Sequence, residues 1–199
     1  MNSRFAFLFL IVLALTVTSS NAQNFCDTSR FGATNGTQAK NGSCSSTVQG
    51  EIPDVDHMIS SLIIFPPNEA SLFANQNFTV SVHVIGLDTG FFDNPATNYY
   101  LAPQKVNNNT GNIQGHSHIT IQQLNHDNLV APDPKIFASF KALNNVSINN
   151  ILSQDVGPLP VGYYRICTMV SSSGHQPTLM PVAQRGSQDD CVRISMIAS

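Results

Sequence analysis

The sequence contains no tryptophan and little charge, and these absences exclude several classes of function. Charged residues make up 11% of the 199 residues, and the 9 basic ones form no cluster, which argues against a nucleic-acid partner. Its two glutamates, Glu51 and Glu69, have no evident partner carboxylate for glycoside hydrolysis. No GxSxG segment is present, so the nucleophile elbow of many serine hydrolases is missing. We find no complete catalytic set and expect a non-enzymatic protein.

Long apolar runs are also absent beyond the first residues of the chain. One runs from Phe5 to Val17, after Arg4 and before the small residues Ser20 and Ala22. It is too short to span a bilayer comfortably, and this order of segments is typical of a secretory signal peptide. We therefore predict a signal peptide over residues 1–22. The mature protein is expected to be secreted, extracellular or in the cell wall, without a membrane anchor.

Glycosylation sequons and cysteines agree with secretion. Five Asn-x-Ser/Thr sequons are present, so we expect surface glycans on some of Asn35, Asn41, Asn77, Asn108 and Asn145. The four cysteines predict two disulfides in an oxidising compartment. Three pairings are possible, and we favour Cys26–Cys44 with Cys167–Cys191 because each pair closes a local loop. No CxxC spacing is present, which argues against a zinc knuckle.

The pattern from residue 58 onward predicts short strands separated by turns. Residues 78–85 alternate between apolar and polar side chains, as in a half-buried strand, and 97–102, 115–124, 161–171 and 190–197 are further predicted strands. Asp133-Pro134-Lys135 and the apolar residues after it fit a short helix or a distorted strand. We predict an all-β antiparallel sandwich over 58–199, similar in strand order to immunoglobulin and fibronectin type III domains but without the tryptophan of antibody domains. Residues 23–57 are expected to form an irregular, glycosylated N-terminal segment.

Histidines provide the sharpest candidate site. In the segment Gly115-His116-Ser117-His118 the two imidazoles point the same way from a strand, which suits a Zn²⁺ or Cu²⁺ ion. His83, His175 or His57 would supply a third ligand. The alternative is that these are surface histidines bonded to their neighbours, and no cofactor is certain. A copper polysaccharide monooxygenase is disfavoured because the expected mature N-terminus is Gln23 rather than histidine.

The long connection between Cys167 and Cys191 is a second candidate, because long loops in compact domains are often functional. It concentrates polar residues that suit a ligand: His175, Gln184, Arg185, Asp189 and Asp190. The alternative, which we favour, is a hairpin insertion in which Arg185 pairs with Asp189 or Asp190.

Four blocks of the sequence carry a resemblance to a known family: GHSHITIQQL, APDPKIFASFKALN, LPVGYYRICTMV and GHQPTLMPVAQRGSQDDC. They resemble small secreted proteins of filamentous, mainly mushroom-forming, fungi, a family without established activity. The resemblance implies a fungal source and an extracellular location. Some relatives carry a small-subunit ribosomal protein label, which the signal peptide and the acidic composition contradict.

These observations favour a secreted, non-catalytic glycoprotein that acts as a binding or structural module at the cell surface or in the extracellular matrix. Its partners would be cell-wall polysaccharide or an extracellular protein. A metal-binding extracellular protein or enzyme built on His116 and His118 is the second interpretation. A secreted effector that acts on a host or a competitor is the third.

Overall fold

The structure, a computed structural model, describes residues 24–125 and 130–199. The predicted signal peptide lies outside the described residues. Two short 3-10 turns precede the strands, η1 (Phe25–Thr28) and η2 (Val55–His57). The strands in chain order are β1 (Ser60–Phe65), β2 (Ser71–Phe73), β3 (Phe78–Ile85), β4 (Leu87–Asp88), β5 (Ile113–Leu124), β6 (Ser139–Leu143), β7 (Ile151–Val156), β8 (Gly162–Ser172) and β9 (Cys191–Ile197).

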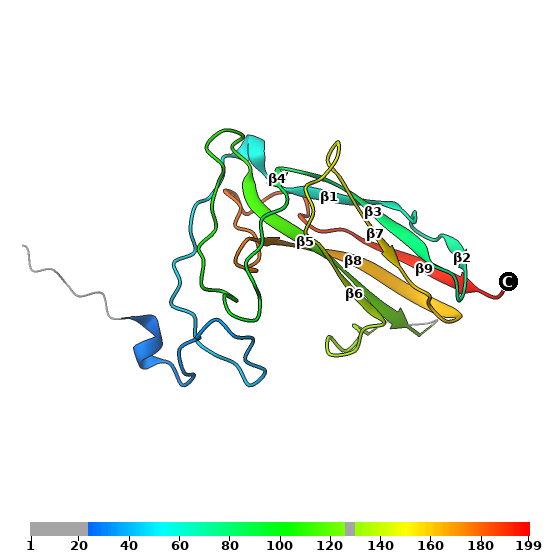
Figure 1. The fold of residues 1–199 in the computed structure, drawn as a ribbon, viewed down its shortest axis with the longest axis horizontal. Coiled ribbons are helices and arrows are strands. Elements are labelled where there is room, and N and C mark those ends of the chain that lie inside the picture. The colour runs from blue at the N-terminus through cyan, green and yellow to red at the C-terminus, as the bar shows by residue number, and fades with distance from the viewer. Residues whose placement is uncertain (1–23, 126–129) are drawn as a thin grey trace, which may run out of the picture.

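The strands form two sheets that pack face to face (Figure 1). One sheet has the order β1-β3-β7, and the other has the order β2-β9-β8-β5-β4, with β6 also paired to β5. The predicted all-β sandwich is confirmed. Most pairings are antiparallel, but the two short strands β2 and β4 pair in parallel with β9 and β5.

The core lies between the sheets and follows from the alternation of side chains along each strand. Val80, Val82 and Val84 of β3 are buried against Ile119 and Ile121 of β5 in one apolar cluster. Successive strand residues point to opposite faces, so an inward valine on β3 places the residue after it outward. On β5 the same rule sends Ile119 and Ile121 into the core and directs His116 and His118 to the opposite face.

Several elements differ from the sequence prediction. Residues 97–102 form turns rather than a strand, because Asn94 accepts hydrogen bonds from the backbone N–H groups of Ala96, Thr97 and Asn98. Such local bonds compete with the ladder of a sheet. For the segment after Pro134, where a short helix and a distorted strand were both open, the structure has a strand, β6, from Ser139. Strands β2, β4 and β7 were not predicted.

The structure contains two disulfides, Cys26–Cys44 and Cys167–Cys191, which are the pairs that local spacing favours. Cys167 and Cys191 lie directly opposite each other on β8 and β9, with Cα atoms 4.1 Å apart. Cys26–Cys44 closes a loop within the N-terminal segment. Two disulfides indicate an oxidising environment. Among the described residues, no helix is long and apolar enough to cross a membrane.

The N-terminal segment lies along the connection between β4 and β5 at one end of the sandwich (Figure 1). The hydroxyl of Thr47 donates to the carbonyl of Tyr100 at 2.7 Å, and the side chain of Gln38 donates to the carbonyl of Pro95. Glu51 N–H bonds to the carbonyl of Gln104. These contacts join the N-terminal segment to the connection from residue 89 to residue 112. The connection itself contacts β5, because Phe91 N–H donates to Gly115 O next to His116.

Candidate metal centre

Two of the site's histidines come from the same face of β5. His116 and His118 are two positions apart, so their rings leave the strand on one side. Ser171 and Met169 of β8 are their partners in register. Gly115 precedes them where β5 and β8 approach closely: a Cβ at this position would collide with the carbonyl oxygen of Ser171. The glycine therefore allows the close strand pairing that places both rings.

The third histidine comes from the turn that ends β8. His175 N–H donates to Ser172 O at 3.0 Å, and Ser172 N–H donates to Gln176 O at 3.0 Å, so the chain folds back on the strand. His175 has a φ of +71°, in the left-handed region that few residues other than glycine adopt, although histidine is among those enriched there. Such backbone strain concentrates at functional sites. The turn is held from outside by Tyr100 N–H, which donates to Gly174 O.

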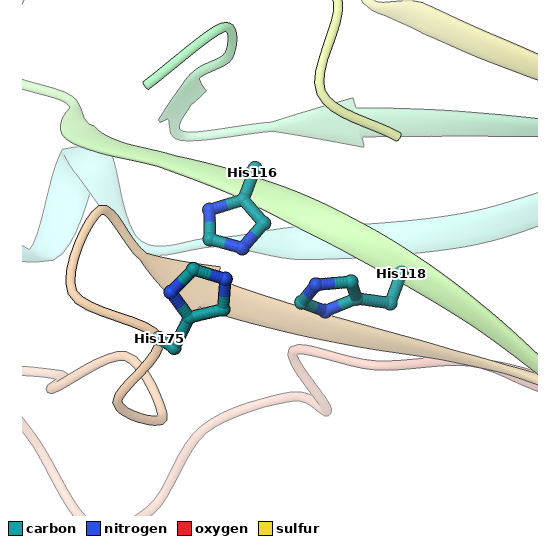
Figure 2. Close-up of side chains that lie close together, drawn as sticks. All are labelled: His116, His118 and His175. Carbon is teal, nitrogen blue, oxygen red and sulfur yellow. The ribbon is translucent and has the colours of Figure 1, made fainter. Parts of the chain in front are cut away.

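The three rings converge on one space (Figure 2). Ring centroids are 4.7 Å apart for His116–His118, 4.5 Å for His116–His175 and 5.8 Å for His118–His175. One nitrogen from each ring can be chosen so that all three lie within 4.8 Å of one another. Three such atoms always have a point between them that is no more than about 2.8 Å from each, so shifts of under 1 Å would reach the 2.0–2.1 Å of a Zn–N bond.

Hydrogen bonds fix the roles of the ring nitrogens in two of the histidines. His116 Nδ1 lies 3.1 Å from the carbonyl of Phe91, and His118 Nδ1 lies 3.3 Å from the carbonyl of Met169. A carbonyl only accepts, so each Nδ1 carries the proton and each Nε2 presents a lone pair. Backbone carbonyls orient metal-binding histidines in this way. His116 Nε2 is buried and has no hydrogen-bond partner within residues 24–125 and 130–199.

Burial keeps the rings neutral. Desolvation, with the neighbouring histidines next in size, lowers the pKa of His116 to about 3 and that of His118 to about 4. Desolvation also lowers the pKa of His175, which the Asp93 carboxylate partly offsets. Neutral imidazoles are the form that binds metals. His116 and His118 are 0% and 7% exposed, so the alternative of surface histidines is wrong for these two.

The other histidines that we considered lie elsewhere. His83 is on β3, in the other sheet, where it pairs with Leu62 and Ile151. His57 Nδ1 lies 2.7 Å from Asp54 Oδ1, and this bond raises the pKa of His57 and lowers that of Asp54. Neither belongs to the three-histidine cluster formed by His116, His118 and His175.

The polar residues of the loop before Cys191 do not converge as a ligand site. Arg185 donates to Val182 O and to the side chain of Gln188, so its predicted pairing with Asp189 or Asp190 is wrong. Asp189 Oδ1 accepts from Thr168 Oγ1 and from Val170 N–H, while Asp190 accepts from Ile63 N–H. Gln184 is exposed. The two aspartates therefore bind the loop to the sheets. Of these residues His175 alone joins the three-histidine cluster, and Asp189 lines the cavity beside it.

Sequence reasoning missed the connection between β4 and β5, which covers the cluster. Phe91 supplies the carbonyl that holds His116, and the Phe92 ring meets His116 edge-on at 6.1 Å. The Tyr99 ring stacks on Tyr100 at 4.1 Å and lies 5.9 Å from the ring of His175. The aromatic residues were visible in the sequence, but nothing there indicated that this loop returns to β5.

All five sequon asparagines are exposed, as glycan attachment requires: Asn35, Asn41, Asn77, Asn108 and Asn145.

Comparison with known proteins gives a family match. Residues 61–197 match the family described as CLU5d N-terminal domain. Pathogenicity cluster 5 protein d of the fungus Colletotrichum graminicola is 44% identical over 186 residues, or 90% of this chain. The chain spans 38% of the length of that relative.

A solved structure also matches, at greater distance. It is the CARDB domain of the PF1109 protein from Pyrococcus furiosus, in complex with di-metal ions. The TM-score is 0.36 and the identity 11%, with 76% of this chain and 100% of that chain covered. The likeness is too low to inform the site.

Proposed function

Since the chain belongs to the CLU5d N-terminal domain family, we propose that it is an extracellular module of a fungal protein that binds one Zn²⁺ or Cu²⁺ ion through His116, His118 and His175. The observation that carries this proposal is the buried Nε2 of His116, which has no hydrogen-bond partner among the described residues and sits on a ring of the convergent cluster. An unpaired buried polar atom is costly, and a metal ion in the shared space satisfies it. Imidazole ligands suit both metals.

The extracellular assignment has independent support. Two disulfides, five exposed sequons and the predicted signal peptide over residues 1–22 all fit a secreted glycoprotein. We infer that the sandwich is a non-catalytic binding module whose partner is cell-wall polysaccharide or an extracellular protein. Retention of the purified protein on chitin, β-glucan or cellulose would support the polysaccharide version. Failure to bind any of these or a cell-wall fraction would reject it.

Metal analysis tests the central proposal. Protein purified without chelators should contain one Zn or Cu per chain, and His118→Gln or His175→Gln should abolish this content. His83→Gln is the matched control, because it removes a histidine outside the cluster. At a metal concentration 100 times the Kd, binding adds about 2.7 kcal/mol of stability, or roughly 5–10 °C in Tm. An unchanged Tm of the wild-type protein on addition of Zn²⁺ and of Cu²⁺ would refute the proposal.

A second candidate function comes from the name of the relative. That protein is called a pathogenicity cluster protein, which favours an effector that acts on a host. The two functions are compatible, since a metal-binding module can be part of a longer effector. Expression confined to contact with another organism would support this candidate, whereas constitutive expression in pure culture would reject it.

A further inference from the structure

A cavity of about 410 Å³ opens beside the three-histidine cluster. His118 and His175 line it, whereas His116 is fully buried and does not. A metal ion bound by the three rings would therefore have His116 behind it. With three protein ligands, a tetrahedral ion keeps one position for an exogenous ligand. Because two of the three ligands line the cavity, an exogenous ligand would reach that position from it.

The cavity is mainly aromatic and apolar, with one charged side chain among those that line it. Tyr99, Tyr100, Phe140 and Met169 form much of the wall, and no lysine or arginine of the described residues takes part. The charged residue is the acidic Asp189, whose Oδ1 accepts hydrogen bonds from Thr168 Oγ1 and Val170 N–H. A bound metal ion is then the source of positive charge in this cavity, so an incoming anionic group would bind the metal.

Aromatic rings lie near the position that an exogenous ligand would take on the metal. The ring of Phe140 lies 5.0 Å from that of His118, and the stacked pair of Tyr99 and Tyr100 lies on the side of His175. Phe140 and Met169 are each 46% exposed, so their apolar surface is available at the mouth of the cavity. Aromatic rings prefer offset or edge contacts with other rings, which an aromatic ligand in the cavity can make. A volume of this size is in the range of small-molecule sites.

We propose that the cavity binds a small aromatic compound with an anionic oxygen donor, such as an aromatic carboxylate, whose oxygen takes the open position on the metal and whose ring packs against Phe140 and Tyr99. This inference rests on the proposed metal site. The metal supplies the anchor for the oxygen, and the aromatic walls supply the selectivity for a ring over an aliphatic chain of the same charge.

The test uses the full chain loaded with Co²⁺, whose visible absorption reports its coordination. Benzoate and acetate are titrated separately at the same pH. We expect both to change the spectrum, with benzoate binding at least about tenfold more tightly because of its ring contacts. Phe140→Ala and Tyr99→Ala should each reduce this preference without loss of Co²⁺. Phe73→Ala is the control, because Phe73 is 54% exposed on β2 and does not line the cavity.

The outcomes separate the two proposals. Failure of the protein to bind Co²⁺, Zn²⁺ or Cu²⁺ would overturn both. Stoichiometric Co²⁺ with no spectral response to benzoate, or with equal affinity for benzoate and acetate, would leave the metal site and overturn the aromatic ligand. A preference for benzoate that survives in both the Phe140→Ala and the Tyr99→Ala proteins would also overturn it.

Discussion

Acid should destabilise the metal-free protein through the histidine cluster. In the folded state burial lowers the pKa of His116 to about 3 and that of His118 to about 4. Both rings take up protons near pH 6.5 once the chain unfolds. Between these values the unfolded state binds more protons than the folded state, so the free energy of unfolding falls as the pH falls. The stability that the neutral rings contribute is complete above about pH 6.5 and is lost progressively down to about pH 4 for His118 and about pH 3 for His116.

The size of this effect follows from the linkage relation. For His118, with a pKa of about 4 in the folded state and about 6.5 in the unfolded state, the free energy of unfolding is about 2 kcal/mol lower at pH 5 than at pH 7.5. Relaxation of the fold or entry of water that halves this effect leaves about 1 kcal/mol. The pKa of His175 is lowered too and adds in the same direction. His57 opposes them, because its raised pKa stabilises the folded state as the pH falls through the same window. The contribution of His57 is the same in wild type and in His118→Gln, so it cancels when the two proteins are compared.

The assay is urea unfolding at pH 5 and pH 7.5 in the presence of a chelator. Wild-type protein should lose about 1–2 kcal/mol more than His118→Gln between the two pH values. His83→Gln should behave as wild type. Equal losses in wild type and His118→Gln would refute the view that the cluster is buried and neutral.

Further predictions concern the disulfides, the core and the glycans. Non-reducing peptide mapping should recover Cys167–Cys191, and removing this bridge should cost about 3 kcal/mol in urea unfolding in the chain-entropy model; a Cys44–Cys167 peptide would contradict the structure. Ile121→Ala should lower the free energy of unfolding by about 2–5 kcal/mol, because Ile121 is 0% exposed between the sheets, and a loss below 1 kcal/mol would argue against this packing. Protein secreted from a fungal host should lose mass on treatment with an N-glycosidase, and Asn145→Gln should lower the mass by one glycan if that exposed sequon is occupied; an unchanged mass under enzyme treatment would reject glycosylation.

The sandwich could be predicted because alternation of apolar and polar side chains along the sequence indicates a strand with one buried face. Phe78–Ile85 reads as a strand for this reason, and it is β3 in the structure. Strand β7 had a readable signal that we missed. Asn149 and Asn150, with φ of +52° and +63°, form a two-residue turn between Ile148 and Ile151, as expected of a hairpin that needs positive φ at both central residues.

The site could be predicted only in part. The His-x-His spacing of His116 and His118 fixes two rings on one face of a strand. The sequence left the third ligand open among His57, His83 and His175. The answer depends on the turn at the end of β8, which places His175 beside the other two rings. The turn that brings back His175 has hydrogen bonds within residues 172–176, but its position over β5 depends on β8 pairing with β5. The burial that makes the rings neutral depends on the 89–112 connection, whose return to β5 has no local signal.

The central claim is that three histidines bind one metal ion, and anomalous diffraction tests it most directly. Crystals grown with Zn²⁺ or Cu²⁺ would be measured on both sides of the absorption edge of the metal. The account predicts one strong peak with nitrogen atoms of His116, His118 and His175 about 2.0–2.1 Å away. Crystals of metal-treated protein without a peak at this cluster, or with the ion bound by other residues, would contradict it.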